Sequence, residues 1–135
     1  MEHHTSAMTL ADRYELIEPP IGEGSFGAVY LANDRKMPRQ VAVKVLHQAY
    51  ASDPKASARF LRELVAACRV SHENAIQVLD VGDDPTYGLF YVMEFAEGVA
   101  LDERLIGKPI RWPILKVVSQ QLAAALDAIH GAGIV

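Results

Sequence analysis

The sequence predicts an α+β domain in which a five-stranded antiparallel sheet with one packed helix is followed by two further helices. Three observations support this class. Short runs rich in β-branched residues alternate with turns rich in Gly, Asp and Pro as far as Met93. A single helical pattern interrupts these runs after the third of them, and only helical patterns follow the fifth. Because neighbouring runs are joined by short turns, the strands are expected to pair antiparallel.

The first predicted strand, Tyr14 to Glu18, alternates apolar and polar side chains and ends at Pro19-Pro20. Proline has no N–H to donate to a ladder, so this segment suits an edge of the sheet. Turn residues such as Asn33-Asp34 and Met37-Pro38 separate the later strands. The other four strands are predicted over residues 28–32, 40–46, 75–81 and 89–93.

The helix that interrupts the strands begins at Ser52-Asp53-Pro54, which supplies a side-chain cap followed by Pro in the first turn. Apolar residues recurring at intervals of three and four carry this helix to about Arg69. A short helix is expected over residues 101–105 and a long amphipathic one over residues 112–130. The long helix has an apolar stripe made of Ile114, Val117, Val118, Leu122, Ala125, Leu126 and Ile129.

The composition is that of a globular protein. The 135 residues suffice for one domain, and half of them are hydrophobic. A net charge of −4 gives no reason to expect nucleic acid as a partner. No apolar run approaches the ~18 residues of a membrane span, and the first residues lack the pattern of a signal peptide. The single cysteine, Cys68, cannot form an internal disulfide, so we expect a reducing, cytoplasmic location.

A Gly-x-Gly-x-x-Gly motif at Gly22, Gly24 and Gly27 predicts contact with phosphate groups. In the dinucleotide-binding fold this motif joins a strand to a helix, whereas in a nucleotide-covering hairpin it joins two strands. The segment after Gly27 is strand-like, and about 20 residues on from the glycines stands Lys44 rather than an acid that would hold a ribose. The sequence therefore favours the hairpin. A plain Gly-rich turn is the alternative, and it weakens once Lys44 and Glu63 are considered together.

Lys44 lies inside an apolar strand and needs a partner, because a lone buried ammonium is costly. Glu63 stands nineteen residues later, on the helix that is expected to pack across the sheet. The alternative for Glu63 is local, since Arg59 lies one helical turn before it and Arg62 is adjacent. The residues alone leave both pairings open.

These motifs resemble the N-terminal lobe of eukaryotic-type protein kinases. Two segments, Arg59-Phe-Leu-Arg-Glu63 and Val78-Leu-Asp-Val-Gly-Asp83, are most similar to the bacterial serine/threonine branch. The resemblance implies an N-terminal extension at 1–13, a nucleotide-binding lobe with its hinge at 14–96, and the start of an incomplete helical C-lobe at 97–135. It also implies transfer of the ATP γ-phosphate to protein Ser or Thr, with ATP and a protein substrate as partners and Mg²⁺ as cofactor of the complete kinase.

The resemblance assigns catalytic roles to Lys44, which would hold the α- and β-phosphates, and to Glu63, which would hold Lys44. Phe26 would cap the glycine loop and Met93 would be the gatekeeper of the pocket. The backbone of Glu94 and Ala96 would meet the adenine edge. The complete set of expected nucleotide-binding residues is Ile21, Gly22, Glu23, Gly24, Ser25, Phe26, Gly27, Ala28, Val29, Ala42, Lys44, Met93, Glu94 and Ala96, with no metal ligand in the chain.

Residues 128–135 resemble the lead-in to the family's catalytic loop, and the 135 residues contain neither His-Arg-Asp nor Asp-Phe-Gly. The family's catalytic base and metal ligands belong to those motifs and to the Asn that follows the first. We therefore expect the chain by itself to be inactive. The alternative is a half-kinase without chemistry that docks on a partner or regulates a full kinase. The apolar stripe over residues 114–129 is expected to drive self-association if it is exposed.

Overall fold

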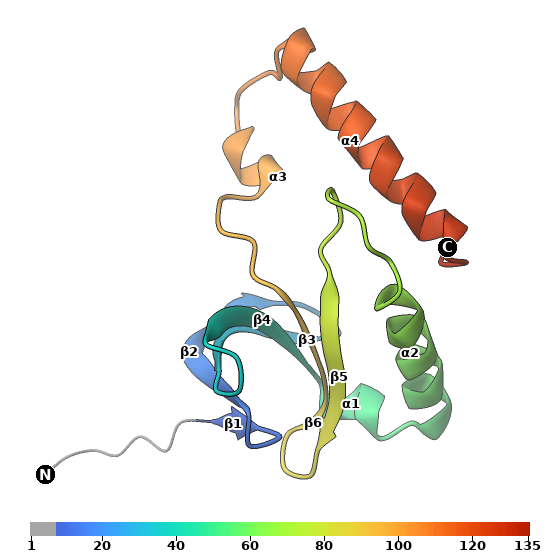
Figure 1. The fold of residues 1–135 in the computed structure, drawn as a ribbon. Coiled ribbons are helices and arrows are strands. Elements are labelled where there is room, and N and C mark those ends of the chain that lie inside the picture. Colours follow the sequence, from blue (N-terminus) through green and yellow to red (C-terminus); the bar gives the residue numbers. More distant parts are fainter. Residues whose placement is uncertain (1–7) are drawn as a thin grey trace, which may run out of the picture.

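The computed structural model describes residues 8–135, which form a curled antiparallel sheet with helices on one side of it and beyond its end (Figure 1). The strands lie in the order β1-β2-β3-β4-β6-β5. The α+β class is confirmed, with six strands in place of the five predicted. The strands are β1 (Thr9–Leu10), β2 (Tyr14–Glu23), β3 (Gly27–Asp34), β4 (Arg39–Leu46), β5 (Val78–Asp84) and β6 (Gly88–Glu94). The helices are α1 (Gln48–Ala51), α2 (Pro54–Ala67), α3 (Leu101–Arg104) and α4 (Trp112–Gly131).

Two elements, β1 and α1, were not predicted, because two residues of strand and one turn of helix are too short to show a period. β1 pairs antiparallel with the start of β2, so part of the expected N-terminal extension belongs to the sheet. The turn between them holds Ala11 and Asp12 in the left-handed region, at φ of 50° and 53°. Asp84 secures this turn by accepting a hydrogen bond from the Ala11 N–H at 2.9 Å. Residues 1–7 of the expected extension lie outside the described range.

Two strand boundaries differ from the prediction. β2 continues through Pro19-Pro20 to Glu23, and its register with β3 shifts between Ile17 and Gly22, where the prolines cannot donate to the ladder. β5 starts three residues later than predicted and extends to Asp84. The side chain of Asp84 accepts the N–H groups of Thr86 and Tyr87, so the turn to β6 begins after Asp84 rather than before it.

The apolar core lies on one face of the sheet. Tyr14 packs the edge of its ring on Phe90, with the ring centroids 6.1 Å apart, and its hydroxyl donates to Asp80 at 2.7 Å. Burial of the phenol, together with this carboxylate, raises the pKa of Tyr14 above its usual range. The cluster of buried residues around this pair consists of Leu10, Tyr14, Leu16, Ala32, Val41, Val43, Phe90 and Val92.

α2 begins as predicted, with Asp53 accepting the Lys55 N–H at 3.0 Å and Pro54 in the first turn. It ends at Ala67, two residues before the predicted Arg69. Of its apolar stripe only Leu64 is buried, and Val65 is half exposed. The helix therefore rests on the sheet through a narrow contact and leaves much of its surface open.

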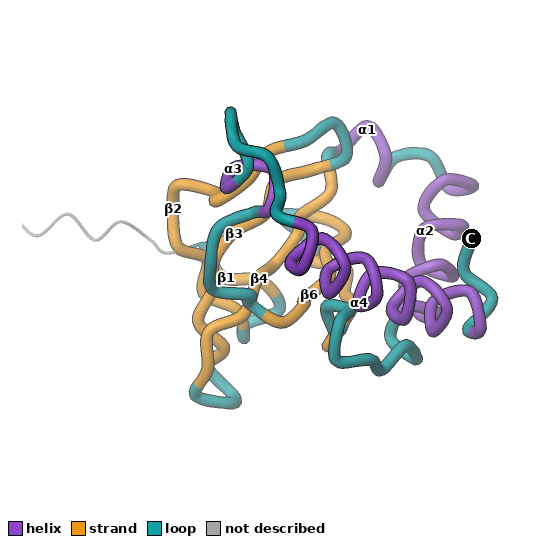
Figure 2. The backbone as a smooth tube through the Cα atoms, turned by 90° about the horizontal axis from the view of Figure 1, so that it is seen from above, coloured by secondary structure: helices purple, strands orange, loops and turns teal. Residues whose placement is uncertain are grey.

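α4 stands apart from the sheet, and its C-terminal end comes back towards α2 (Figures 1 and 2). The Asn74 side chain donates to the Gln121 carbonyl at 3.3 Å and ties the loop before β5 to α4. Most of the predicted apolar stripe is open to solvent, with Leu122 57% and Leu126 51% exposed. None of the helices within residues 8–135 is both long and apolar enough to span a membrane.

Asp34 closes the β3–β4 hairpin from inside the protein. Its side chain has no exposed surface and accepts two hydrogen bonds from the Arg13 guanidinium, at 2.8 and 2.9 Å. Arg39 and the backbone N–H groups of Lys36 and Met37 also donate to it. The Arg13 guanidinium, helped by these backbone donors, holds the pKa of Asp34 well below its usual range.

We predict that Asp34→Asn lowers the free energy of unfolding at pH 7 by about 2 kcal/mol, less than for a fully buried pair because Arg13 remains partly in water. A depressed folded-state pKa stabilises the protein above the unfolded-state pKa of about 3.9 and loses that effect as the pH falls through the folded value. The difference in free energy of unfolding between the unchanged protein and Asp34→Asn, measured with urea, should therefore shrink below about pH 4. Asp83→Asn is the exposed control, and an equal effect of both substitutions would contradict the prediction.

Candidate functional site

Four of the predicted site residues share the face of the sheet opposite the apolar core. The register pairs Lys44 with Val29 on one side and Tyr91 on the other. Ala42, two residues before Lys44, is paired with Met93. Directly opposed residues project from the same face, as do residues two apart on one strand. Val29, Ala42, Lys44 and Met93 therefore form one surface.

The glycine motif forms a hairpin between β2 and β3, as predicted, and not a strand-to-helix turn. Gly22 pairs with Val29 and Glu23 with Ala28, and the Gly24 N–H donates to the Gly27 carbonyl at 3.0 Å. Ser25 and Phe26 lie at the tip, where the Phe26 side chain is 54% exposed. Ile21, before the hairpin, is 56% exposed.

The glycines of this hairpin differ in the space around them. A Cβ on Gly27 would overlap the backbone carbonyl of Val45 on the neighbouring strand. A Cβ on Gly22 would meet no atom within 4 Å. Gly27 is thus required by the packing of β3 on β4, whereas Gly22 leaves open space above the hairpin for a ligand to approach the backbone.

An unpredicted contact holds the tip of the hairpin against α1. The His47 N–H donates to the Phe26 carbonyl at 3.0 Å, and His47 Nε2 lies 3.1 Å from the Gly24 carbonyl oxygen, so this nitrogen carries the proton. The centroids of the Phe26 and Tyr50 rings lie 5.1 Å apart. These rings border a pocket of about 240 Å³ that is also lined by Leu46, Ala56, Ser57, Arg59, Phe60 and Glu63.

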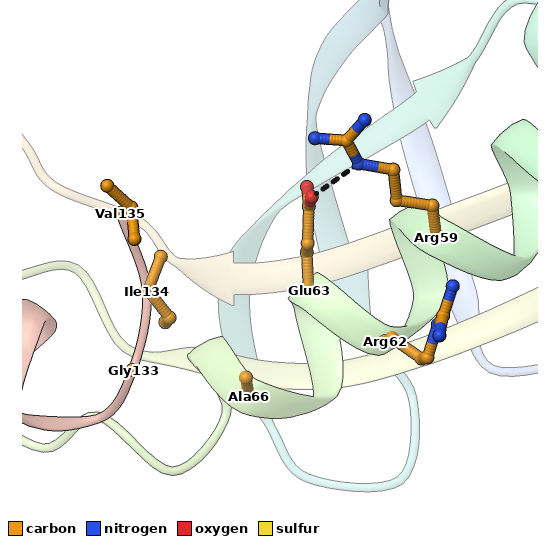
Figure 3. Close-up of a pocket in the computed structure, with 7 residues that line it drawn as sticks. All are labelled: Arg59, Arg62, Glu63, Ala66, Gly133, Ile134 and Val135. Carbon is orange, nitrogen blue, oxygen red and sulfur yellow. Dashed lines mark hydrogen bonds and ion pairs between the residues drawn. The ribbon is translucent and has the colours of Figure 1, made fainter.

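The predicted pair between Lys44 and Glu63 is not formed in the structure. Glu63 instead accepts a hydrogen bond from Arg59 Nε at 3.0 Å, the local alternative, and both side chains are mostly exposed (Figure 3). Lys44 is half-buried and makes no ion pair within residues 8–135. α2 nevertheless lies over this part of the sheet, where the centroid of the Phe60 ring is 6.0 Å from that of Tyr91.

The residues predicted to meet the adenine edge lie at the end of β6, where Glu94 is the last residue of the strand, and just after it at Ala96. The Glu94 N–H donates to the Gln77 carbonyl at 3.0 Å, and the Gln77 N–H donates to the Glu94 side chain at 3.2 Å. Glu94, Phe95 and Ala96 border a hollow of about 340 Å³ together with residues of β4 and the start of β5. Within the described part of the chain, no group of three or more His, Cys, Asp or Glu side chains is arranged to hold a metal ion.

Comparison with known proteins gives one family and a set of bacterial relatives. The family model of the protein kinase domain matches residues 15–135 of this chain. The serine/threonine-protein kinase pkn3 of Myxococcus xanthus is 39% identical over 132 residues, which cover 94% of this chain and 23% of that relative. The probable serine/threonine-protein kinase PknB of Corynebacterium glutamicum is 36% identical over 130 residues, 93% of this chain and 20% of that relative.

Among solved structures, the kinase domain of Mycobacterium tuberculosis PknI superposes with a TM-score of 0.77 at 30% identity. The match covers 96% of this chain and 52% of that domain. The chain thus spans about half of a solved kinase domain and a quarter or less of the two curated relatives.

We predict that Gly27→Ala lowers the free energy of unfolding by about 2 kcal/mol, because the added methyl group forces β3 and β4 apart. Gly22→Ala, on the same hairpin but with open space around it, should change stability by less than about 0.5 kcal/mol. Chemical denaturation of both variants tests this. Equal destabilisation would show that Gly27 is not confined by Val45.

Proposed function

We propose that this chain, which belongs to the protein kinase domain family, is the ATP-binding portion of a serine/threonine protein kinase that transfers the γ-phosphate of ATP to protein Ser or Thr. The observation that carries the proposal is the common sheet face of Val29, Ala42, Lys44 and Met93, which adjoins the glycine hairpin. The serine/threonine-protein kinase names of the relatives support the reaction class.

Residues of this face and of the segments beside it suit different parts of ATP. The open backbone at Gly22 gives phosphate oxygens access to amide donors, and the Lys44 ammonium supplies a point charge for the α- and β-phosphates. Val29 and Ala42 are small and apolar, which suits the flat adenine. The Glu94 carbonyl and the Ala96 N–H are proposed as partners of the adenine edge.

The proposed nucleotide-binding lobe comprises residues 14–96, and the helical lobe starts at 97. Mg²⁺ neutralises phosphate charge when it is bound with ATP. Because the 135 residues contain no His-Arg-Asp and no Asp-Phe-Gly, we propose that the metal would be held here mainly by the nucleotide itself. This chain's own contribution is to bind and orient the phosphates and the adenine.

The chain should bind ATP, and Lys44→Ala should weaken binding about tenfold or more, because a charged hydrogen bond to phosphate contributes roughly 1.5–3 kcal/mol. Calorimetry with and without Mg²⁺ measures this. Lys36→Ala, an exposed lysine in the turn between β3 and β4, is the matched control. A cooperatively melting chain that binds no ATP would refute the proposal.

The isolated chain should transfer no measurable phosphate to a generic protein substrate, because the 135 residues lack the family's catalytic base. Incubation of the pure protein with labelled ATP and substrate tests this expectation. Phosphorylation of the substrate that disappears in Lys44→Ala would show that the chain is active by itself.

We also propose that the chain self-associates through the exposed stripe of α4, where Ile114, Val117, Leu122 and Leu126 are all more than half exposed. Light scattering at about 100 μM should give a mass above that of the monomer, since buried apolar area drives association. Leu122→Glu should reduce that mass, whereas Gln120→Glu, which adds the same charge on the opposite side of α4, should not. A monodisperse monomer would contradict this proposal.

The same stripe supports the second candidate function, a half-kinase without chemistry that docks on a partner protein. Glu63 pairs with Arg59 and not with Lys44 in the described structure, which is consistent with a half-kinase that performs no chemistry. The ATP-binding experiment separates the two candidates, because a docking module does not require an ATP affinity that depends on Lys44.

A further inference from the structure

We propose that Arg59 is a positioning residue that competes with Lys44 for the Glu63 carboxylate and so controls how readily Lys44 is oriented towards phosphate. The inference rests on the proposed function, in which Lys44 binds the phosphates. It starts from the ion pair that Glu63 makes with Arg59 Nε at 3.0 Å.

Glu63 lines a pocket together with Leu46 of β4, the strand that carries Lys44, although Glu63 and Lys44 form no ion pair in the described structure. Phe60, three residues before Glu63 on α2, lies against Tyr91, and Tyr91 is the direct cross-strand neighbour of Lys44. Residues three apart on a helix share a side of it. α2 therefore presents Glu63 near the strand that carries Lys44, and reorientation of the carboxylate with a modest adjustment of the helix would exchange one cation for the other.

Space for this exchange is present on both sides of the ion pair. Arg59 and Glu63 border the pocket of about 240 Å³ beneath Phe26. They also border a second pocket, of about 610 Å³, between α2 and residues 133–135 (Figure 3). Glu63 is thus held by its partner and not by surrounding atoms, which fits its 61% side-chain exposure.

Arg59 has an advantage over Lys44 as the partner of Glu63, because it lies on the same helix. Arg59 and Glu63 are four residues apart on one helix, so their pair is available wherever α2 lies. The pair with Lys44 requires α2 to be correctly placed on the sheet. Exposed pairs at this spacing shift an equilibrium about twofold, so Arg59 should reduce the population in which Glu63 orients Lys44 by about that factor.

Arg62 provides a matched control within the same helix. It borders the same 610 Å³ pocket and carries the same charge, and it makes no ion pair in the described structure. In Figure 3 its side chain lies apart from Arg59 and Glu63. Arg62→Gln therefore removes one positive charge near the site without releasing Glu63.

The first test compares Mg-ATP affinity by calorimetry in Arg59→Gln and Arg62→Gln, after thermal melts show that both variants fold. Both lose one positive charge, so the general loss of attraction for ATP is shared. We expect Arg59→Gln to bind about twofold more tightly than Arg62→Gln, and the difference to vanish when Glu63→Gln is added to both. Equal or weaker binding by Arg59→Gln, or a difference that persists without Glu63, would overturn the inference.

The second test uses no nucleotide. The rate of Lys44 acylation by a small amine-reactive reagent, followed by peptide mapping, should be about twofold slower in Arg59→Gln than in Arg62→Gln, because a Lys44 side chain held in an ion pair with Glu63 is less available to the reagent. A slower rate in a chain that binds no ATP would support the inference while the proposed function fails. ATP binding that depends on Lys44, with equal acylation rates, would leave the proposed function standing and refute the role of Arg59.

Discussion

The pairing of β4 with β3 and β6 is the constraint on which the rest of the structure depends. β4 lies between these strands, and its alternate residues serve two purposes. Val41 and Val43 have almost no exposed surface and belong to the core, while Ala42 and Lys44 project from the other face. A slip of one residue would exchange the faces and place the Lys44 ammonium in the core, so burial of the valines sets the position of the lysine.

This register is secured at both ends of the β3–β4 hairpin. At one end the buried Asp34 carboxylate collects the Arg13 guanidinium and the N–H groups of the turn. At the other end Gly27 packs without a side chain against the Val45 carbonyl, and His47 binds the backbone of the glycine loop. The ion pairs of Asp34 and the close backbone packing at Gly27 thus hold in place a strand whose face opposite the core carries the candidate site.

The contrast between Lys44 and Glu63 shows how differently the two elements are constrained. Lys44 is placed by strand pairing and by the core beneath it. Glu63 is on a helix with one buried residue, Leu64, and with open pockets on two sides. On such a helix Glu63 takes a partner one helical turn away, because an ion pair at that spacing requires no tertiary arrangement.

The sequence by itself determined the elements whose signals are local. Asp53-Pro54 defined the start of α2, the alternation around Lys44 defined β4, and the glycines with the strand after them defined a hairpin. Tertiary structure alone decided β1 and α1, which depend on contacts such as Ala11 with Asp84 and Phe26 with Tyr50, and it set the later start of β5. It also decided between the two partners that the sequence left open for Glu63, since the pair with Lys44 requires α2 to be correctly placed on the sheet. Residue periodicity encodes which face of an element is apolar, but the position of a helix on a sheet results from packing between distant segments.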